Sequence, residues 1–251
     1  MLLYIERWLK APAQLEDGSL IGRNKGTPQG GVISPLLANI FLHHVFDEWM
    51  KVSYPKLLFA RYADDIIVHC RTKAQAKVIW KAIERRLSRC KLQLHPEKTK
   101  IVYCKDTKRP ESYQHESFDF LGYTFRSRLC KGRSCFVGFT PAVSQSAIKA
   151  MSSTIRGWKL RLWSSASLEE VAKQINPVIR GWLNYYGKFY RSALYPILRQ
   201  IQNALLRWAM RKYKKLKGHW RRATQWLGRI ALRDPRLFAS WEFGFRPLVG
   251  Q

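Results

Sequence analysis

The sequence has 251 residues, with 45 lysines and arginines against 17 aspartates and glutamates, which gives a formal net charge of +28. Such an excess favours a polyanionic partner, nucleic acid first and an anionic membrane surface second, because each cation placed on a phosphate releases a condensed counterion. Apolar residues make up 46% of the chain, which argues against disorder throughout. No apolar run approaches the ~20 residues of a membrane span, and no signal-peptide pattern opens the chain. We therefore expect a cytoplasmic protein without a membrane partner.

Basic charge is concentrated in the second half of the chain. Residues 1–126 hold 21 lysines and arginines against 13 acids, whereas residues 127–251 hold 24 against 4. A stretch containing glycine, serine and cysteine precedes Gly138-Phe-Thr-Pro141, and helical patterning resumes after it. We therefore predict two domains, residues 1–137 and 138–251.

Helix and strand patterns alternate in the first domain. Ser34 as N-cap and Pro35 in the first turn predict a helix start, and apolar residues recur at helical spacing as far as Trp49. A second, amphipathic helix is predicted over residues 73–90. Segments rich in β-forming residues are expected at 57–70, where Asp64-Asp65 marks a turn, and at 99–103 and 118–125. This mixture predicts an α+β fold.

The second domain has helical patterning throughout. The tetrapeptide Ser167-Leu-Glu-Glu170 is a capping box, and Pro177 is expected to kink the helix that it opens. A second long helix is predicted from Tyr195 to Lys217. The sequence Ile-Arg-Gly-Trp occurs at 155–158 and again at 179–182, and we interpret the two copies as a paired helix-packing device.

The five cysteines are odd in number and scattered, which argues against a disulfide framework and predicts reduced thiols. They are Cys70, Cys90, Cys104, Cys130 and Cys135. The last two could supply half of a metal site, but no second pair of Cys or His with zinc spacing accompanies them.

Two adjacent carboxylates, Asp64 and Asp65, lie between apolar runs. Alone, such a pair indicates a solvated turn, because the two charges repel each other and each prefers water. The flanking apolar residues indicate buried strands, which would hold the turn rigidly in a concave site. Adjacent carboxylates fixed there suit Mg²⁺, which binds few carboxylates together with substrate phosphates. Two such ions clamp the attacking and leaving oxygens in phosphoryl transfer.

The sequence around this pair resembles a known family. Tyr62-Ala-Asp-Asp65 resembles the metal-binding box of reverse transcriptases, and Lys25 to Asn39, KGTPQGGVISPLLAN, resembles the preceding box of the group II intron-encoded family. Three later segments continue the resemblance in order. Residues 94–100 are similar to the next block of the family. Residues 118–125 are similar to the hairpin that grips the primer end, and residues 179–186 to the thumb and maturase region.

The resemblance implies a partial right-hand polymerase palm, an antiparallel sheet with helices, followed by an all-α thumb and maturase domain. It implies RNA-templated DNA synthesis, and binding of intron RNA that promotes splicing and mobility. The implied partners are intron RNA, an RNA template with a DNA primer, and deoxynucleoside triphosphates.

Roles of single residues follow from the same resemblance. Asp64 would ligate two Mg²⁺ ions, with Asp65 beside it. Tyr62, Gln29, Gly30 and Gly31 would lie near the nucleotide and template, Lys98 near the triphosphate, and Leu121-Gly122 would form the primer-grip turn. The simpler readings are an ordinary tight turn for the glycine pair, a surface lysine for Lys98, and a plain β-turn at Leu121-Gly122.

Tryptophans and cations are interleaved in the second domain, a pattern suited to RNA. We expect most of the tryptophans to pack between helices, since they recur on apolar faces. The cations are the candidates for phosphate contact, because few acids are available to neutralise them. These candidates are Arg211, Lys212, Lys214, Lys215, Arg221 and Arg222.

Family polymerases use a further aspartate from a strand upstream of the Pro-Gln-Gly block, and residues 1–18 resemble only the tail of the block that carries it. Glu6, Glu16 and Asp17 lie outside the motif. We therefore expect this chain alone to extend primers poorly, unless an N-terminal half or a second protomer supplies the remainder. The alternative is a non-catalytic RNA-binding splicing factor, or a decayed fragment.

Overall fold

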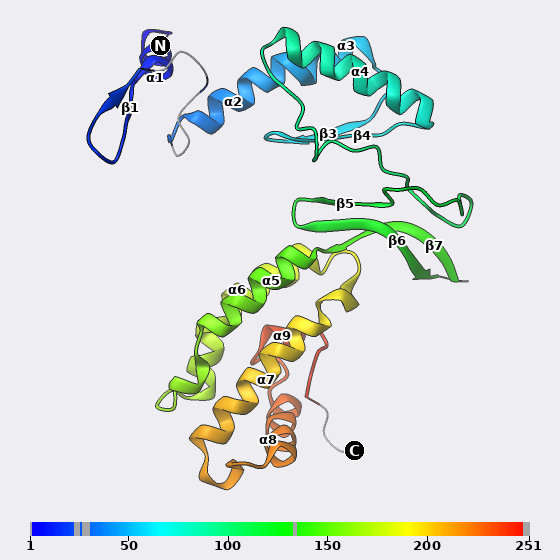
Figure 1. Cartoon of the computed structure of the whole chain (residues 1–251). Helices are drawn as coiled ribbons and strands as arrows, with labels where there is room; N and C mark the ends of the chain where they lie inside the picture. Colours follow the sequence, from blue (N-terminus) through cyan, green and yellow to red (C-terminus); the bar gives the residue numbers. More distant parts are fainter. Residues whose placement is uncertain (1, 23–25, 27–30, 133–134, 248–251) are drawn as a thin grey trace. The chain divides into compact units, whose positions relative to one another are not determined.

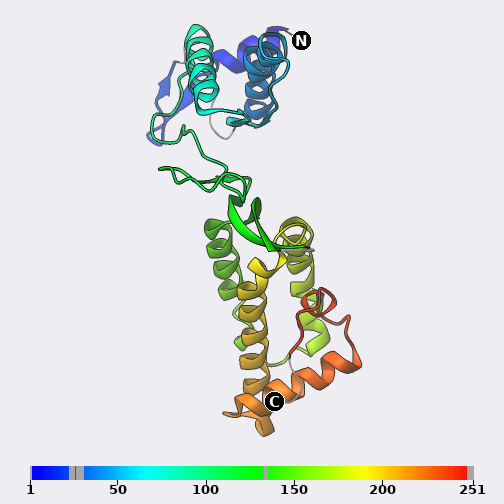
Figure 2. The same cartoon turned by 90° about the vertical axis from the view of Figure 1, so that its right-hand side faces the viewer.

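The computed structural model of the protein describes residues 2–22, 26, 31–132 and 135–247. They form helices and small antiparallel sheets (Figure 1, Figure 2), and this mixture confirms the predicted α+β class. The helices are α1 (Leu2–Lys10), α2 (Ser34–Leu42), α3 (Glu48–Ser53), α4 (Lys73–Arg89), α5 (Gln145–Gly157), α6 (Leu168–Tyr186), α7 (Tyr195–Lys212), α8 (Trp220–Arg233) and α9 (Ala239–Glu242).

The strands form three antiparallel sheets, β1–β2, β3–β4 and β5–β6–β7. They are β1 (Ala13–Gln14), β2 (Leu20–Ile21), β3 (Phe59–Tyr62), β4 (Asp65–Val68), β5 (Ser117–Phe120), β6 (Tyr123–Lys131) and β7 (Cys135–Val143). A π-helical segment, η1 (His43–Asp47), joins α2 to α3, and the 3₁₀ segments are η2 (Leu160–Leu162), η3 (Arg191–Leu194) and η4 (Lys214–Leu216).

The chain divides into two compact units, Met1–Ile101 and Val102–Gln251. The stretch Gly138–Pro141, expected to mark a domain boundary, lies inside β7, where Gly138 pairs with Arg128 of β6. It is therefore a strand, because its backbone groups are used in pairing with β6. The division into functional domains 1–137 and 138–251 stays a prediction.

The first unit has its core between the helices and the β3–β4 hairpin. Figure 1 shows α3 and α4 beside this hairpin. Phe46 and Met50 are fully buried, and Phe59 of β3 packs edge-on against Phe46 at 5.4 Å. The buried set consists of Val45, Phe46, Met50, Ile79, Ile83 and Leu87. It confirms the helical periodicity predicted for α4, whereas in α2 the apolar residues that recur at helical spacing, Leu36, Ile40 and Phe41, are exposed.

Two local predictions in the first part of the chain are wrong. The N-cap of α2 is Ile33, and Ser34 is the first helical residue and is buried, although a proline does lie in the first turn as predicted. Residues 99–103 form no strand. Tyr103 N–H donates to His115 O at 2.8 Å, but this isolated bond is not continued into a ladder, and extended backbone needs a paired neighbour to become a strand.

The second unit places a three-stranded sheet at one end of a helical bundle (Figure 1). The predicted hairpin at 118–125 is confirmed, with Phe120 paired to Tyr123 across a two-residue turn. Leu121 and Gly122 both have positive φ, +51° and +76°, as a type I′ turn requires. Phe118 and Phe125 stack at 4.9 Å on one face of this sheet.

The helical core confirms the periodic predictions. The capping box at Ser167 is present, and α6 runs through Pro177. In the repeated tetrapeptide, the rings of Trp158 and Trp182 stack at 5.9 Å, so the two copies do pair α5 with α6. The buried face of α7 is the predicted one, Ile197, Leu198, Ile201, Leu205, Trp208 and Ala209.

The second long helix is shorter than predicted, because α7 ends at Lys212 and the chain continues as η4. All five cysteines are free thiols, as expected. In the described part of the chain, none of the helices combines the length and the apolarity that crossing a membrane requires.

Candidate functional site

The carboxylate pair lies at the tip of the β3–β4 hairpin. Tyr62 pairs with Asp65, so the two turn residues are Ala63 and Asp64, and Asp65 is the first residue of β4. The expectation that both aspartates form the turn is therefore wrong by one residue. Ala63 has φ +52°, the sign that the first central position of a type II′ turn needs. This arrangement places Tyr62, Asp64 and Asp65 together.

Asp64 and Asp65 are exposed, and Tyr62 is 64% exposed. Neither carboxylate forms a hydrogen bond or an ion pair with any residue that the structure describes. Their oxygens are therefore available to a ligand. The strands beside the turn are half-buried and not buried as expected. Phe59, Ile66 and Val68 nevertheless pack against the first core, so the hairpin carries these free carboxylates on a supported backbone.

A polar network beneath the turn was not predicted from the sequence. Arg61 donates from Nε and Nη2 to both carboxylate oxygens of Asp47, each at 2.7 Å, and from Nη1 to Asn39 Oδ1 and Ala63 O, each at 2.9 Å. The side chains of Arg61 and Asp47 are only 10% and 15% exposed. The hydrogen bonds from Arg61 hold the pKa of Asp47 below its usual range, and Asp47 raises the pKa of Arg61.

The network links the two sequence boxes. Asn39 is the last residue of the KGTPQGGVISPLLAN segment, and Arg61 directly precedes Tyr62. Both residues could therefore have been singled out from the sequence, because Asn39 lies in one box and Arg61 next to the other. Asp47 had no such signal, since it belongs to an ordinary Asp-Glu pair in a helical stretch outside both boxes.

The other nucleotide-site candidates are less well defined. Gln29 and Gly30 lie outside the described residues. Gly31 O accepts a hydrogen bond from Ser34 N at 3.2 Å in the turn that enters α2. Lys98 is exposed in a turn and forms no hydrogen bond or ion pair within the described ranges. Within the described ranges, no contact therefore links Lys98 to the Asp64 turn, and its role stays a prediction.

Two carboxylates suit part of a magnesium site. Mg²⁺ is usually held by one or two carboxylates, with substrate phosphates and water completing six ligands. Asp64 and Asp65 supply oxygens of this kind. Within the described ranges, the Asp64 turn included, no group of three or more His, Cys, Asp or Glu side chains is placed to hold a metal ion.

Hydrogen bonds connect the Leu121–Gly122 turn and the start of β6 to the end of α6. Tyr185 donates from its hydroxyl to Leu121 O at 2.9 Å, and the Tyr123 hydroxyl donates to Tyr185 O. A Cβ at Gly122 would lie 2.6 Å from the Tyr186 hydroxyl oxygen, so only glycine lets these groups approach so closely. The turn thus has a fixed position relative to α6.

The residues predicted to contact phosphates lie on α7, η4 and α8. Five of the six candidates, Arg211, Lys214, Lys215, Arg221 and Arg222, are exposed. Lys212 differs, because its ammonium group donates to Ala166 O at 2.6 Å and to Ser165 O at 3.3 Å. It also lies over the rings of Trp208 and Tyr213, at 5.6 and 5.9 Å, so its charge is used within the protein.

The tryptophans of the second part are mainly core residues, as predicted. Trp208 and Trp241 are fully buried, whereas Trp220 is 44% exposed. Four others are partly buried against the same core, and these are Trp158, Trp163, Trp182 and Trp226.

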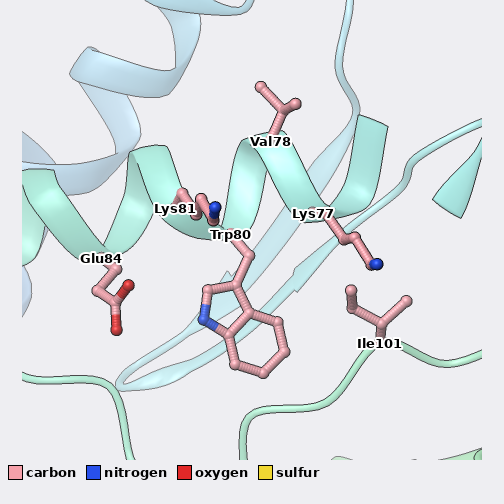
Figure 3. A pocket seen from close by; sticks show the side chains of 6 residues that line it. All are labelled: Lys77, Val78, Trp80, Lys81, Glu84 and Ile101. Carbon is pink, nitrogen blue, oxygen red and sulfur yellow. The ribbon is translucent and has the colours of Figure 1, made fainter. Parts of the chain in front are cut away.

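A surface pocket of about 460 Å³ lies along α4 and contains none of the predicted site residues. Figure 3 shows the Trp80 ring extending from the helix between Glu84 and Ile101, with Lys77 and Lys81 on the same helix. The remaining lining residue is Val78. The pocket is shallow and open, and it adds nothing to the carboxylate site.

Comparison with known proteins gives two family matches. Residues 2–125 match the family described as reverse transcriptase (RNA-dependent DNA polymerase), and residues 148–226 match the group II intron maturase-specific domain. The first match contains the Asp64 hairpin, and the second contains Arg211 to Arg222. The chain is also 29% identical to protein YkfC of Escherichia coli (strain K12), over 59% of this chain and 45% of YkfC. It thus spans less than half the length of this curated relative.

Proposed function

The chain belongs to the group II intron reverse transcriptase and maturase family, and from this premise we propose that its first part forms the palm of an RNA-directed DNA polymerase. The second part is proposed to be a thumb and maturase domain that binds intron RNA to promote splicing and mobility. The proposed substrates are deoxynucleoside triphosphates and an RNA template with a DNA primer.

One observation carries the proposal. The β3–β4 hairpin presents two free carboxylates, Asp64 and Asp65, beside the exposed ring of Tyr62, while its strands are anchored in the first core. Carboxylates that were merely part of a solvated turn would need neither strands packed against the first core nor the Arg61 network. The pair is therefore suited to hold a charged ligand at a fixed place.

The candidate residues of the two units have separable roles in the proposed reaction. Asp64 and Asp65 would hold Mg²⁺, which when bound offsets the charge on the attacking and leaving oxygens. Tyr62 would support the primer-terminal or incoming nucleotide with its exposed ring, and Gly31 would let backbone approach the template because it has no Cβ. Leu121 and Gly122 would position the primer end.

The second part is proposed to supply affinity for structured RNA. The exposed cations on α7, η4 and α8 can contact phosphates. Such contacts position an RNA but do not distinguish its sequence. Lys212 is the weakest candidate among them, since a phosphate would compete with the two carbonyl oxygens that it already binds.

We expect weak synthesis from this chain alone, because the proposed metal site has two carboxylates, Asp64 and Asp65, and the described residues place no third acidic ligand with them. The decisive experiment measures DNA primer extension on an RNA template with Mg²⁺, together with RNA affinity, for the parent chain, Asp64→Asn and Glu84→Gln. Glu84 is an exposed acid of the same unit, on α4, and serves as the matched control.

The outcomes separate the readings. Synthesis that is lost in Asp64→Asn and kept in Glu84→Gln, with unchanged RNA affinity in both, supports the enzyme. A parent chain that binds RNA but is inert in extension supports the non-catalytic splicing factor. A parent chain that neither extends primers nor binds structured RNA contradicts the proposal as a whole.

A further inference from the structure

The side chain of Arg61 donates a hydrogen bond to the backbone carbonyl of Ala63, in the turn that bears Asp64. We infer that Arg61 is a positioning residue that fixes this turn for metal binding, and that Asn39 and Asp47 hold its guanidinium in the required orientation. This inference rests on the proposed function, in which Asp64 holds a divalent ion. Neither Arg61, Asn39 nor Asp47 contacts the ion in this scheme.

The geometry of the guanidinium carries the first step. A planar guanidinium offers five donors in a fixed fork. Two of them bind the two oxygens of Asp47 in the bidentate arrangement that gives strong, directional bonding. With the plane set by Asp47, Nη1 is directed at both Asn39 Oδ1 and Ala63 O. The position of the Ala63 carbonyl is thereby defined by groups on α2 and η1.

The turn needs such support. Ala63 has φ +52°, a region that residues with a Cβ seldom occupy, and such conformations persist only where neighbouring groups hold them. Ala63 directly precedes Asp64. If Nη1 no longer held the Ala63 carbonyl, the turn could relax toward a less strained conformation, and the Asp64 carboxylate would move with it.

Charge pairing lets Arg61 act here without opposing a cation. An unpaired guanidinium close to a magnesium ligand would repel the ion. Asp47 neutralises it through two bonds of 2.7 Å, and both side chains are largely shielded from water. Asp47 therefore orients the guanidinium of Arg61 and also neutralises its positive charge, which would otherwise act on the metal ion.

The π-helical segment η1 explains how one helix provides both partners of Arg61. Asn39 and Asp47 are eight residues apart, and eight residues of regular α-helix turn the chain by about 800°, which leaves them about 80° out of phase. The π-helical turn accommodates one extra residue. The rotation about the helix axis from Asn39 to Asp47 is then that of about seven α-helical residues, about 700°, which is close to two full turns. Both side chains then face Arg61.

Two further bonds hold this frame in place. Arg86 of α4 donates from Nε to Val45 O at 2.9 Å, inside η1. Asn39 donates from Nδ2 to Pro35 O at 2.9 Å, which leaves Oδ1 to accept from Arg61. The network thus extends from the first turn of α2 to the turn that bears Asp64, and each member has a defined direction.

The test uses Fe²⁺ as a probe in place of Mg²⁺. With ascorbate and peroxide, bound Fe²⁺ generates hydroxyl radicals that cut the nearby backbone, and the cuts are located by mass spectrometry on the whole 251-residue chain. The variants are Arg61→Lys, Asp47→Asn, Asp64→Asn and the control Lys51→Gln. Lys51 forms an exposed 2.9 Å pair with Glu48 on the adjoining helix, so it matches the loss of an ion pair away from the turn.

We expect Mg²⁺-suppressible cuts around residue 64 in the parent chain and in Lys51→Gln, and none in Asp64→Asn. In Arg61→Lys and Asp47→Asn, the Fe²⁺ concentration for half-maximal cutting should rise about tenfold, as for other groups that orient metal ligands. Circular dichroism well below the melting temperature verifies that each variant is folded. If Arg61→Lys does not fold, Asn39→Ala replaces it, because it leaves the Arg61–Asp47 pair intact and should give a smaller rise.

The two levels of failure are distinct. Absence of cuts at residue 64 in the parent chain, or cuts that persist in Asp64→Asn, overturns the proposed metal site itself. Cuts that depend on Asp64 but have the same Fe²⁺ dependence in parent, Arg61→Lys and Asp47→Asn overturn only the positioning role. A fall in melting temperature with an unchanged Fe²⁺ dependence has the same meaning, since it shows a purely structural network.

Discussion

The hydroxyl of Tyr185, near the end of α6, donates a 2.9 Å hydrogen bond to the backbone carbonyl of Leu121 in the β5–β6 turn. A helix of the proposed maturase region thereby fixes the turn that is proposed to grip the primer. Because both belong to the second compact unit, movement of α6 would carry the turn with it.

Replacing Tyr185 by Phe should loosen this turn while leaving the ring contacts with Tyr123 and Tyr186 in place. Loss of one such hydrogen bond is worth about 1 kcal/mol, so we expect about fivefold weaker binding of an RNA template with a DNA primer, and little change for single-stranded RNA. Fluorescence anisotropy with both ligands measures this difference.

Tyr195→Phe is the matched control, since Tyr195 is 44% exposed and its hydroxyl forms no hydrogen bond among the described residues. An equal loss of affinity in both variants, or an unchanged affinity in Tyr185→Phe, would argue against a link between α6 and primer binding.

Two glycines of the second unit should respond oppositely to alanine. Gly122 has φ +76°, and a Cβ there would lie 2.6 Å from the Tyr186 hydroxyl, whereas Gly181 in α6 has open space around its Cβ position. We expect Gly122→Ala to lower the free energy of unfolding by at least about 1 kcal/mol. Gly181→Ala should raise it by about 0.5–1 kcal/mol, since alanine favours helix.

Urea unfolding followed by circular dichroism measures both changes. The Tyr186 ring packs against Tyr123 and Tyr185, so it cannot swing away cheaply from a new methyl group. A Gly122→Ala protein as stable as the parent would mean that this aromatic cluster yields more readily than its contacts indicate.

Features with a local cause were predictable from the sequence. The buried face of α7 follows from apolar spacing, and the Ser167 capping box from two residues three apart. The hairpin that contains Gly122 was likewise predictable. In each case the residues that determine the structure are neighbours in the chain, so their pattern is sufficient.

Features that need a distant partner were not predictable. Arg61 and Asp47 are 14 residues apart and meet only after the hairpin packs on the helices. The π-helical turn that brings Asp47 into phase has no sequence signature, and residues 99–103 had strand character but no strand to pair with. Lys212 was expected to face a phosphate, yet it binds carbonyls about 46 residues earlier in the chain, a contact visible only in three dimensions.

Asn176 is the clearest single test of the helical core. It is buried in α6, donates from Nδ2 to Leu237 O at 2.8 Å, and accepts at Oδ1 from Ala239 N at 2.9 Å. Asn176→Ala leaves a buried carbonyl and a buried N–H without partners. We expect a loss of about 1–3 kcal/mol in the free energy of unfolding.

The control for this change is Asn184→Ala, which removes an exposed asparagine from the same helix and should change stability little. Thermal or urea unfolding of both variants measures the comparison. If Asn176→Ala cost no more than Asn184→Ala, the link from α6 to the segment before α9 would not contribute to stability.

The cysteines should differ in reactivity according to their burial. Burial raises the pKa of Cys70 and of Cys104, whereas Cys135 is exposed at the start of β7. Since the thiolate is the nucleophile, a raised pKa leaves less of it at a given pH and burial also blocks access. We therefore expect N-ethylmaleimide at neutral pH to label Cys135 first and Cys70 and Cys104 much later.

Pulsed labelling followed by mass spectrometry gives the rate at each position. Cys135→Ser should remove the fastest phase and leave the slow ones unchanged, and in denaturant all five thiols should react at similar rates, because the protection comes from the fold. Rapid labelling of Cys104 in the native chain would show that the segment between Ile101 and β5 opens to solvent. Its thiol could not then be shielded as the structure requires.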